Sequence, residues 1–594
     1  MSMDLILAHG RFFDGGGGGS ATRHLRIREG RVIEISETPL EDEAAEHLDC
    51  TGKWVMPGFL DIHTHYDAEL LAAPGLCESV RHGVTTVMLG SCSLSTILCG
   101  PEDCGDLFAR VEALPREFVV TTLAKERGWS SPSEYVEALE SLPLGPNVAC
   151  LFGHSDVRAH VMGLGRSVDP AVRPTEDELL QMEAHLESAL DAGFVGLSTM
   201  TNPWDKLDGD RFRSAQLPSS YASWSEFRRL NDILRRRDRV HQGAPNITTK
   251  YNILLYLMQS AGWWLRKPLK TALITGADPK AEPFIAGLIT RLAGAFNSLF
   301  GANFRWQSLP MPFEVYADGV DLVVFEEFGA GQRALHLRDG PDRDALLKDP
   351  AYREEFKRDY AKKWTPRVWH RDFYDATIVG CPDEGLVGCS FGEVSERRGQ
   401  HPVDTFCDLV LEHGRAVRWR TVIANHRPDV HRRLLQDASV QIGFADSGAH
   451  LRNMAFYNFP LHLLRMARDS ENGGPDFLSP ERAVHRLTAE LADWYGLSTG
   501  RLVVGARADI AIIDPTGLDG SIDGYHEASM PGCPGVKRMV RRNDRAVSAT
   551  LVGGEVVYRN GRFREGYGQT SRTGCFLSAG QRDGSVAASS TRVA

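Results

Sequence analysis

The 594-residue sequence lacks both a long hydrophobic run and an excess of positive charge. A membrane-spanning helix needs about 18 or more consecutive apolar residues, whereas the most apolar stretch, residues 253–265, is interrupted by Gln259 and Ser260. The net charge is −11 at pH 7 and the pI is near 6.0. These values argue against nucleic acid and anionic membranes as main partners, so we expect neither.

The sequence also lacks a secretory signal and a disulfide framework. The first ten residues contain Asp4 and only a short apolar run, too little for the apolar core of a signal peptide. The eleven cysteines are odd in number and unevenly spread, which is typical of reduced thiols rather than of a disulfide-linked domain. We therefore expect a cytoplasmic protein.

Signatures of nucleotide binding are missing as well. Neither a Walker loop nor a G-x-G-x-x-G turn occurs in the sequence. The glycine-rich run DGGGGGS, residues 14–20, is not followed by the lysine and helix of a phosphate loop, so a flexible hairpin tip is the better interpretation.

What is present is an ordinary globular composition, 42% hydrophobic and 24% charged. Both ends of the chain alternate in the manner of strands, as in DLILAHGRFF near the start and ADIAIIDP and VSATLVGGEVVY near the end. We predict that residues 1–57 and 498–570 form one small β-sandwich. The small and polar tail, residues 578–594, is predicted to be disordered.

The middle of the chain alternates between strand and helix patterns. Eight short apolar runs end in polar residues: GFLDIHTH, GVTTVMLGSC, NVACLFGHS, GFVGLSTM, RVHQGAPN, KTALITGAD, FRWQSLPMP and SVQIGFADSGAH. This pattern predicts an α/β fold, a (β/α)₈ TIM barrel over residues 58–497. Thr175 and Glu178 predict a capping box at the start of one helix. A stretch at about 316–401 is too long for a simple connection and predicts an insertion near the barrel mouth.

The clearest chemical signal is His63-Thr64-His65 at the end of the first run. Residues two apart on a strand point to the same side, so both imidazoles would project toward the barrel mouth, where a divalent metal could bind. Two partly exposed histidines without a metal are the alternative interpretation of this pattern alone.

The context KWVMPGFLDIHTH, followed by GVTTVMLGSCSLS, resembles the amidohydrolase superfamily and, within it, the N-acyl-D-amino-acid deacylases. In that family a cysteine at the end of the second strand is a metal ligand, and the resemblance implies this role for Cys92. Considered alone, Cys92 would be interpreted as a small buried hydrophobic residue. The fourth run contains no lysine that could be carbamylated, which agrees with a cysteine ligand.

The resemblance extends over roughly residues 1–565 and implies further site residues. The segment GHSDVRAHVMG resembles the third strand of the family and places His154 and Arg158 at the site. His241 matches the metal histidine of the fifth strand. Asp446 matches the aspartate of the eighth strand that binds metal and acts as the general base.

The sixth strand departs from the family pattern. The family has a metal histidine there, followed by a lysine that binds the substrate carboxylate, whereas this sequence reads LITGADPKAEPF. Asp278 could replace the histidine as an oxygen ligand, or it could be an ordinary loop residue. Lys280 lies beyond the expected position of the lysine.

The resemblance implies a zinc-dependent hydrolase of a small-molecule amide, most closely a deacylase of N-acyl-(D-)amino acids with one or two zinc ions. His63, His65, Cys92, His241 and Asp446 would hold the metal, with Asp446 as the base and His154 polarising the carbonyl. Two alternatives are hydrolysis of another linear or cyclic amide and a non-catalytic binding protein. The sequence leaves open whether the chain forms a homo-oligomer.

Two features bear on substrate recognition. Arg158 or Arg452 could bind an anionic group in bidentate fashion, although a structural ion pair is an equal alternative for either. The stretch Tyr251–Leu265 follows the fifth strand and carries Trp263 and Trp264. This stretch could receive an apolar acyl or aromatic group, or the tryptophans could pack the helix against the barrel.

Overall fold

A computed structural model describes residues 4–110, 112–246, 249, 251–262, 266–364 and 367–580. Eight parallel strands form the central sheet: β6 (Phe59–Asp61), β8 (Val84–Leu89), β9 (Asn147–Gly153), β10 (Gly196–Met200), β11 (Val240–Ala244), β12 (Lys270–Leu273), β13 (Asn303–Ser308) and β17 (Val440–Ile442). Seven of them lie within one of the eight predicted runs, and β13 begins one residue before its run. β7 (His63–Thr64), after β6, pairs in parallel with β18 (Phe444–Ser447), after β17. This pairing joins the first and last strands, so the predicted barrel is confirmed.

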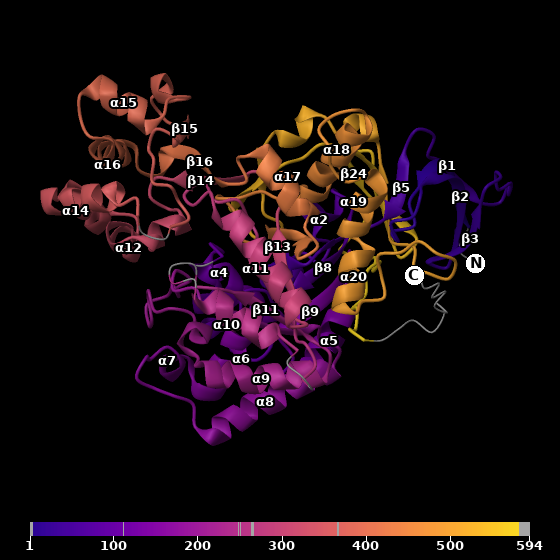
Figure 1. Cartoon of the computed structure of the whole chain (residues 1–594), viewed down its shortest axis with the longest axis horizontal. Helices are drawn as coiled ribbons and strands as arrows, with labels where there is room; N and C mark the ends of the chain where they lie inside the picture. Colours follow the sequence, from indigo (N-terminus) through magenta and orange to yellow (C-terminus); the bar gives the residue numbers. More distant parts are fainter. Residues whose placement is uncertain are drawn as a thin grey trace.

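Helices cover the outside of the barrel (Figure 1). They are α1 (Asp67–Ala72), α2 (Cys77–Val80), α3 (Pro101–Ala109), α4 (Arg116–Glu126), α5 (Pro132–Ser141), α6 (His154–Met162), α7 (Leu164–Ser167), α8 (Glu176–Asp191), α9 (Trp224–Arg236), α10 (Tyr251–Ser260), α11 (Ile285–Leu299), α17 (Pro428–Gln436), α18 (Phe459–Glu471), α19 (Pro480–Leu487) and α20 (Ala489–Tyr495). Helix α8 begins with the predicted capping box of Thr175 and Glu178. No helix in the described part of the chain is long and apolar enough to cross a membrane.

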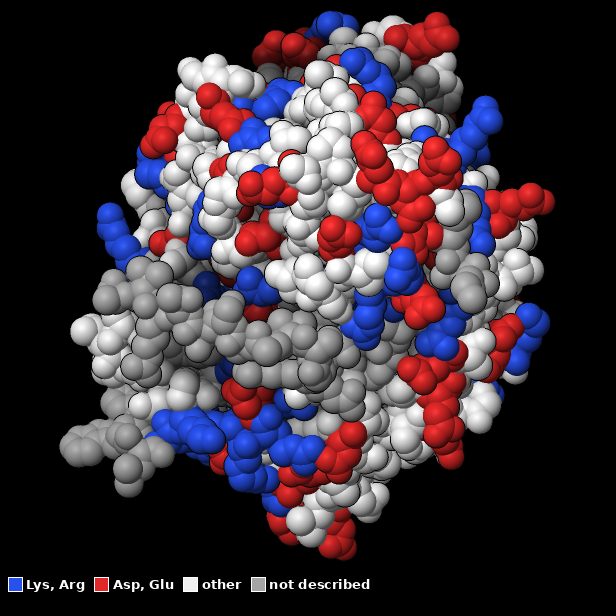
Figure 2. Space-filling view, turned by 90° about the vertical axis from the view of Figure 1, so that its right-hand side faces the viewer, with Lys and Arg blue, Asp and Glu red and all other residues white. Residues whose placement is uncertain are grey.

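Strands from the two ends of the chain form one nine-stranded sheet beside the barrel. Its members are β1 (Leu5–Phe12), β2 (Ala21–Arg28), β3 (Arg31–Ser36), β4 (Glu46–Asp49), β5 (Trp54–Pro57), β19 (Ile510–Ile513), β22 (Val547–Val552), β23 (Glu555–Arg559) and β24 (Arg562–Phe563). The two ends meet where β5 pairs with β19 in antiparallel fashion. Figure 2 shows basic and acidic side chains intermixed over this side of the molecule.

The C-terminal part of the predicted tail lies outside the described residues from position 581 onward. Before that point the chain is held against the barrel, because Ala579 N–H donates to the Gly193 carbonyl and Gly580 N–H donates to the Gly496 carbonyl, both at 2.9 Å.

A separate lobe leaves the barrel after β13 and returns before β17 (Figure 1). Its sheet has the order β14 (Phe313–Asp318), β16 (Arg418–Ala424), β15 (Thr377–Gly380). Its helices are α12 (Gly329–His336), α13 (Pro341–Lys348), α14 (Pro350–Ala361), α15 (Phe391–Arg398) and α16 (Pro402–His413). Aromatic rings in stacked and edge-to-face contact, among them Phe325, Phe406 and Trp419, form its core, so the lobe has its own packed interior.

Candidate metal centre and adjoining cavities

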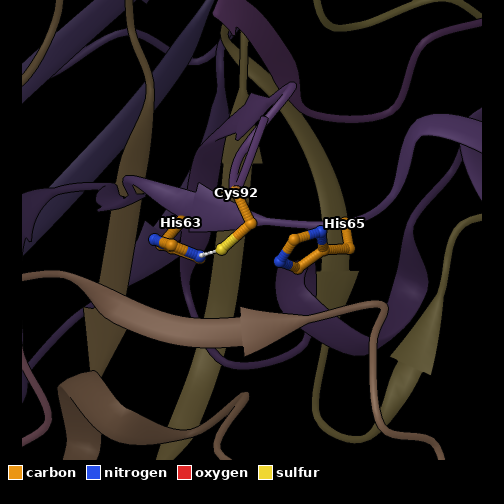
Figure 3. A group of neighbouring side chains, drawn as sticks. All are labelled: His63, His65 and Cys92. Carbon is orange, nitrogen blue, oxygen red and sulfur yellow. Dashed lines mark hydrogen bonds between the residues drawn. The ribbon is translucent and has the colours of Figure 1, made fainter. Parts of the chain in front are cut away.

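Two histidines and a cysteine converge where the first two barrel strands end (Figure 3). His63 lies on β7 and His65 follows that strand, so both rings point to the same side. Cys92 follows β8, and its Sγ lies 3.3 Å from Nε2 of His63. The three side chains are almost completely buried. The structure therefore brings together three of the metal ligands that the sequence suggests.

Asp446, on β18, reaches the same cluster from the other side of the barrel closure. Its Oδ1 lies 3.1 Å from Nε2 of His65 and 3.7 Å from Nε2 of His63. Because β7 and β18 are paired, Asp446 lies on the strand next to the one that carries the two histidines. Asp446 thus adds a carboxylate oxygen to the two imidazole nitrogens and the thiol.

The other nitrogen of each ring lies close to an oxygen acceptor. Nδ1 of His63 donates to Oε1 of Gln307 at 2.8 Å, and Nδ1 of His65 lies 3.3 Å from Oε1 of Glu112. Metal-binding histidines usually donate their second N–H to a carboxylate or carbonyl oxygen, which orients the ring. Both Nε2 atoms are left to face Cys92 and Asp446, so the donor set fits a divalent metal such as zinc.

The electrostatics of the cluster favour a cation. Burial opposes the protonation of His65, yet Glu112 and Asp446 raise its pKa to about 9. Burial, although opposed by the neighbouring His65, raises the pKa of Glu112 to about 8. The pKa of the Cys92 thiol is raised by burial and then by the nearby carboxylates, so the thiol would ionise only with a metal bound.

Several site residues have a left-handed backbone although they are not glycines. The φ angles are +52° at Cys92, +70° at Ser93, +56° at Asp446 and +48° at His450. Such conformations cost about 1–3 kcal/mol each and are found where the surrounding structure enforces them, often at functional sites. Here they lie after β8 and in or after β18, where the chain turns and brings Cys92, Asp446 and His450 together.

His241 does not join the cluster. Its neighbour Gln242 points into the barrel, where its Nε2 donates to the Ile62 carbonyl at 3.4 Å. Successive strand residues point to opposite faces, so His241 points outward, with its ring 5.3 Å from that of Tyr256 on α10. Its Nε2 lies 2.8 Å from Oγ1 of Thr199. The predicted role of His241 as a metal ligand does not fit this position.

His154 and Arg158 also face away from the cluster. His154 is the first residue of α6 rather than part of a strand, so Arg158 lies one turn further along the same helical face. Both contact the same Oε1 of Glu226 on α9, at 2.9 Å and 3.1 Å. Nδ1 of His154 lies 2.9 Å from Oγ of Ser219. Both side chains are fully buried in the helical layer, which fits a structural role and not the predicted catalytic and substrate-binding ones.

The other predicted recognition residues also form ion pairs. Arg452 binds Asp318 and Glu527. Asp278, near the sixth strand, forms a bidentate pair with Arg427. Lys280 pairs with Asp375 at 2.7 Å. Trp263 and Trp264 lie outside the described residues. Of these residues, Arg452 lines a cavity beside the cluster.

Two site residues were missed in the sequence. Glu112 follows α3 in a connection without any recognisable motif. His450 lies four residues after Asp446, and its Nε2 is 3.5 Å from Oδ2 of Asp446. A histidine in the segment ADSGAH of the eighth run was a visible signal, whereas Glu112 gave none.

One sequence motif typical of serine hydrolases has a structural role in this protein. Residues 388–392 read GCSFG, which fits the G-x-S-x-G pattern of serine hydrolases. Ser390 instead caps α15 in the separate lobe, and its hydroxyl is engaged in a capping box with Glu393. Ser390 therefore serves as a helix cap and not as a nucleophile.

Two cavities meet beside the cluster, and His450 lines both. One, of 540 Å³, is lined mainly by apolar side chains of α10, α11 and the lobe, and reaches Asp446. The other, of 690 Å³, is lined by many charged side chains, including Arg452. A reacting bond beside Asp446 would therefore have an apolar compartment on one side and a polar one on the other.

Comparisons with known proteins agree with this architecture. No family model matches the chain. Uncharacterized proteins of Mycobacterium tuberculosis and Mycobacterium bovis are 52% identical to it over 592 residues, covering 98% of this chain and 96% of theirs. The D-aminoacylase of Alcaligenes xylosoxydans xylosoxydans is 33% identical over 200 residues, covering 33% of this chain and 37% of that protein.

Solved structures show the same fold at lower identity. A D-aminoacylase has a TM-score of 0.62 at 20% identity and covers 97% of this chain and 100% of its own. The N-acyl-D-glutamate deacylase from Bordetella bronchiseptica, solved with zinc and a phosphonate inhibitor, has a TM-score of 0.61 at 20% identity, covering 98% and 100%. The chain therefore belongs to one family with the mycobacterial proteins, and its resemblance in motifs and fold is to the D-aminoacylase-like amidohydrolases.

Proposed function

We propose that the protein is a zinc-dependent amidohydrolase that cleaves the C–N bond of N-acyl amino acids. The observation that carries the proposal is the convergence of His63, His65, Cys92 and Asp446, with Nδ1 of His63 hydrogen-bonded to Gln307 and Nδ1 of His65 close to Glu112. The fold shared with D-aminoacylase supports the reaction class. The 33% identity to D-aminoacylase over part of the chain supports the substrate class.

When bound, zinc would act as a Lewis acid that polarises an amide carbonyl and acidifies water. Asp446 would accept a proton from the attacking water and return it to the leaving amine. Against the effect of burial, the hydrogen bond from His65 and the charge of His450 lower the pKa of Asp446, so the carboxylate is ionised at neutral pH, as a proton acceptor must be. His450, 3.5 Å from its Oδ2, could orient this carboxylate or donate to the carbonyl oxygen.

The proposal is tested by metal analysis combined with a substrate panel. Protein purified without chelator should contain at least about one zinc per chain, and the zinc-loaded enzyme should hydrolyse N-acyl-D- or N-acyl-L-amino acids. His63→Gln should lower both the zinc content and the activity. Full activity in a preparation stripped of zinc and of other divalent metals would refute the proposal.

A second candidate is hydrolysis of another linear or cyclic amide. The observation that favours it is the sixth strand, where Asp278 and Lys280 are engaged in ion pairs on the protein itself. Neither is therefore free to bind a substrate carboxylate in the described structure. Hydantoins and dihydropyrimidines in the same panel would distinguish the two candidates.

A further inference from the structure

The apolar cavity beside Asp446 lies between the barrel helices and the separate lobe. Its volume of 540 Å³ is within the range typical of small-molecule sites. Helices α10 and α11 contribute mostly aliphatic side chains, and the lobe adds Val315, Val323, Val324 and Ile423. At its inner end the cavity reaches Phe444, Asp446 and His450. A long apolar group could thus extend from the metal centre between α11 and the lobe.

The outer end of this cavity opens onto an apolar surface. Leu254 on α10 and Leu288 and Leu292 on α11 line the cavity and yet are 48%, 51% and 38% exposed. Figure 1 shows the two helices side by side below the lobe. The surface continues along α11 with Phe284 before the helix and Leu299 at its end, which are 89% and 75% exposed. Exposed apolar patches of this kind commonly mark a binding surface.

The second cavity, which His450 also lines, is bordered by charged instead of apolar side chains. Its volume is 690 Å³, and it is lined by six basic and four acidic side chains. The basic ones are Arg110, Arg213, Arg343, Arg415, Arg452 and Lys537. The five arginines are paired with carboxylates of the protein, whereas Lys537 forms no ion pair with the described residues, so it is the basic group that could receive an anionic group there.

We infer that the substrate is an amphiphilic amide, with a long apolar acyl chain in the cavity between α11 and the lobe and an anionic amine-side head in the arginine-lined cavity. This inference rests on the proposed function, because it places the scissile bond at Asp446. The acyl chain takes the apolar side because the head of an N-acyl amino acid carries a carboxylate, which would lose its hydration in the apolar cavity and suits the charged cavity beside Lys537. The end of a long chain would emerge between Leu254 and Leu288, where the surface is also apolar.

The test compares acyl chains of different length on one amino-acid head. Zinc-loaded full-length protein is assayed with the acetyl, hexanoyl and decanoyl derivatives, each below its micelle concentration. Burial of one methylene is worth about fourfold in binding, so kcat/KM should rise from acetyl to decanoyl by at least about 100-fold. A parallel series keeps the acetyl group and lengthens the head instead. A length dependence confined to this second series would overturn the assignment of the acyl chain to the apolar cavity.

A matched pair of variants on α11 locates the effect. Leu288→Asp places a charge at the cavity mouth and should reduce kcat/KM for the decanoyl substrate at least about tenfold more than for the acetyl substrate. Leu299→Asp places the same charge on the same helix at a residue that does not line the cavity, and it should leave the ratio of the two rates unchanged. If both variants reduced both rates equally and dissociated an oligomer, the apolar surface would be a subunit interface and the inference would be wrong.

A binding measurement separates this inference from the proposed function. Decanoate, the expected product, should bind the protein more tightly than hexanoate in calorimetry, and Leu288→Asp should weaken the binding of decanoate more than Leu299→Asp does. Binding of this kind without hydrolysis of any amide would refute the proposed function and support the apolar chain site. Equal hydrolysis of acetyl and decanoyl substrates would support the function and refute the chain site.

Discussion

Replacement of Gln307 by leucine tests the metal centre without touching a proposed ligand. Oε1 of Gln307 accepts the Nδ1–H of His63 at 2.8 Å, and its Nε2 donates to the hydroxyl of Tyr495 at 3.2 Å. Gln307→Leu has a similar size but leaves a fully buried N–H without an acceptor, which costs about 1–3 kcal/mol of stability. Loss of such a supporting bond typically lowers metal affinity about 10–100-fold, or roughly 1.4–2.8 kcal/mol.

The assay is a competitive zinc titration with a chromophoric chelator, accompanied by thermal unfolding of the zinc-free protein. Tyr495→Phe is the matched control, because it removes the next bond in the network and leaves the contact between Gln307 and His63 in place. This control should lose stability but change the zinc affinity less than about threefold. Gln307→Glu retains an acceptor and should restore tight binding. Zinc affinity of Gln307→Leu equal to that of the wild type, with the fold intact, would show that His63 does not bind the metal through Nε2.

Three further predictions follow from buried groups. Asp446→Asn should lower kcat by roughly 10²–10⁴-fold, and turnover near that of the wild type with zinc retained would exclude it as the base. His241→Gln should leave the zinc content unchanged in elemental analysis, because the ring faces the helical layer; loss of zinc would contradict the described orientation. Burial lowers the pKa of His431 from its ordinary 6.5 to about 4, although a hydrogen bond to the Leu309 carbonyl opposes this shift. The contribution of the neutral His431 to the free energy of unfolding is therefore complete above pH 6.5 and is lost as the pH falls toward 4. Between pH 7.5 and pH 5, urea denaturation should show about 2 kcal/mol more loss of stability in the wild type than in His431→Gln, and equal losses would refute this assignment.

The strands were predictable, but the direction of their side chains was not. Each of the eight apolar runs overlaps a barrel strand, because burial on both faces of the sheet favours apolar residues. The same double burial removes the alternation that would show which residues face inward. All five residues of β11 are buried, so the sequence could not show that Gln242, and not His241, points into the barrel.

The site was predictable where its residues lie close together in sequence at a strand end. His63 and His65 were indicated by their spacing on one strand, and Asp446 by the match of the last run to the family pattern. His154 was misassigned because the strand ends one residue earlier, and a shift of one residue moved it onto a helix whose contacts are with Glu226. Glu112 reaches His65 only through tertiary packing, which no local pattern records.

The pairing of β5 with β19 has a consequence for the order in which the molecule is made. Trp54 lies opposite Ile513, so at about 5–20 residues per second a ribosome would take roughly 20–90 s to synthesise the partner of a strand already made. All eight barrel strands precede β19 in the chain, so the barrel can close while the edge of β5 is still unpaired. An unpaired strand edge invites association with other chains. Nascent chains halted before residue 510 should therefore aggregate more readily than chains that have passed it.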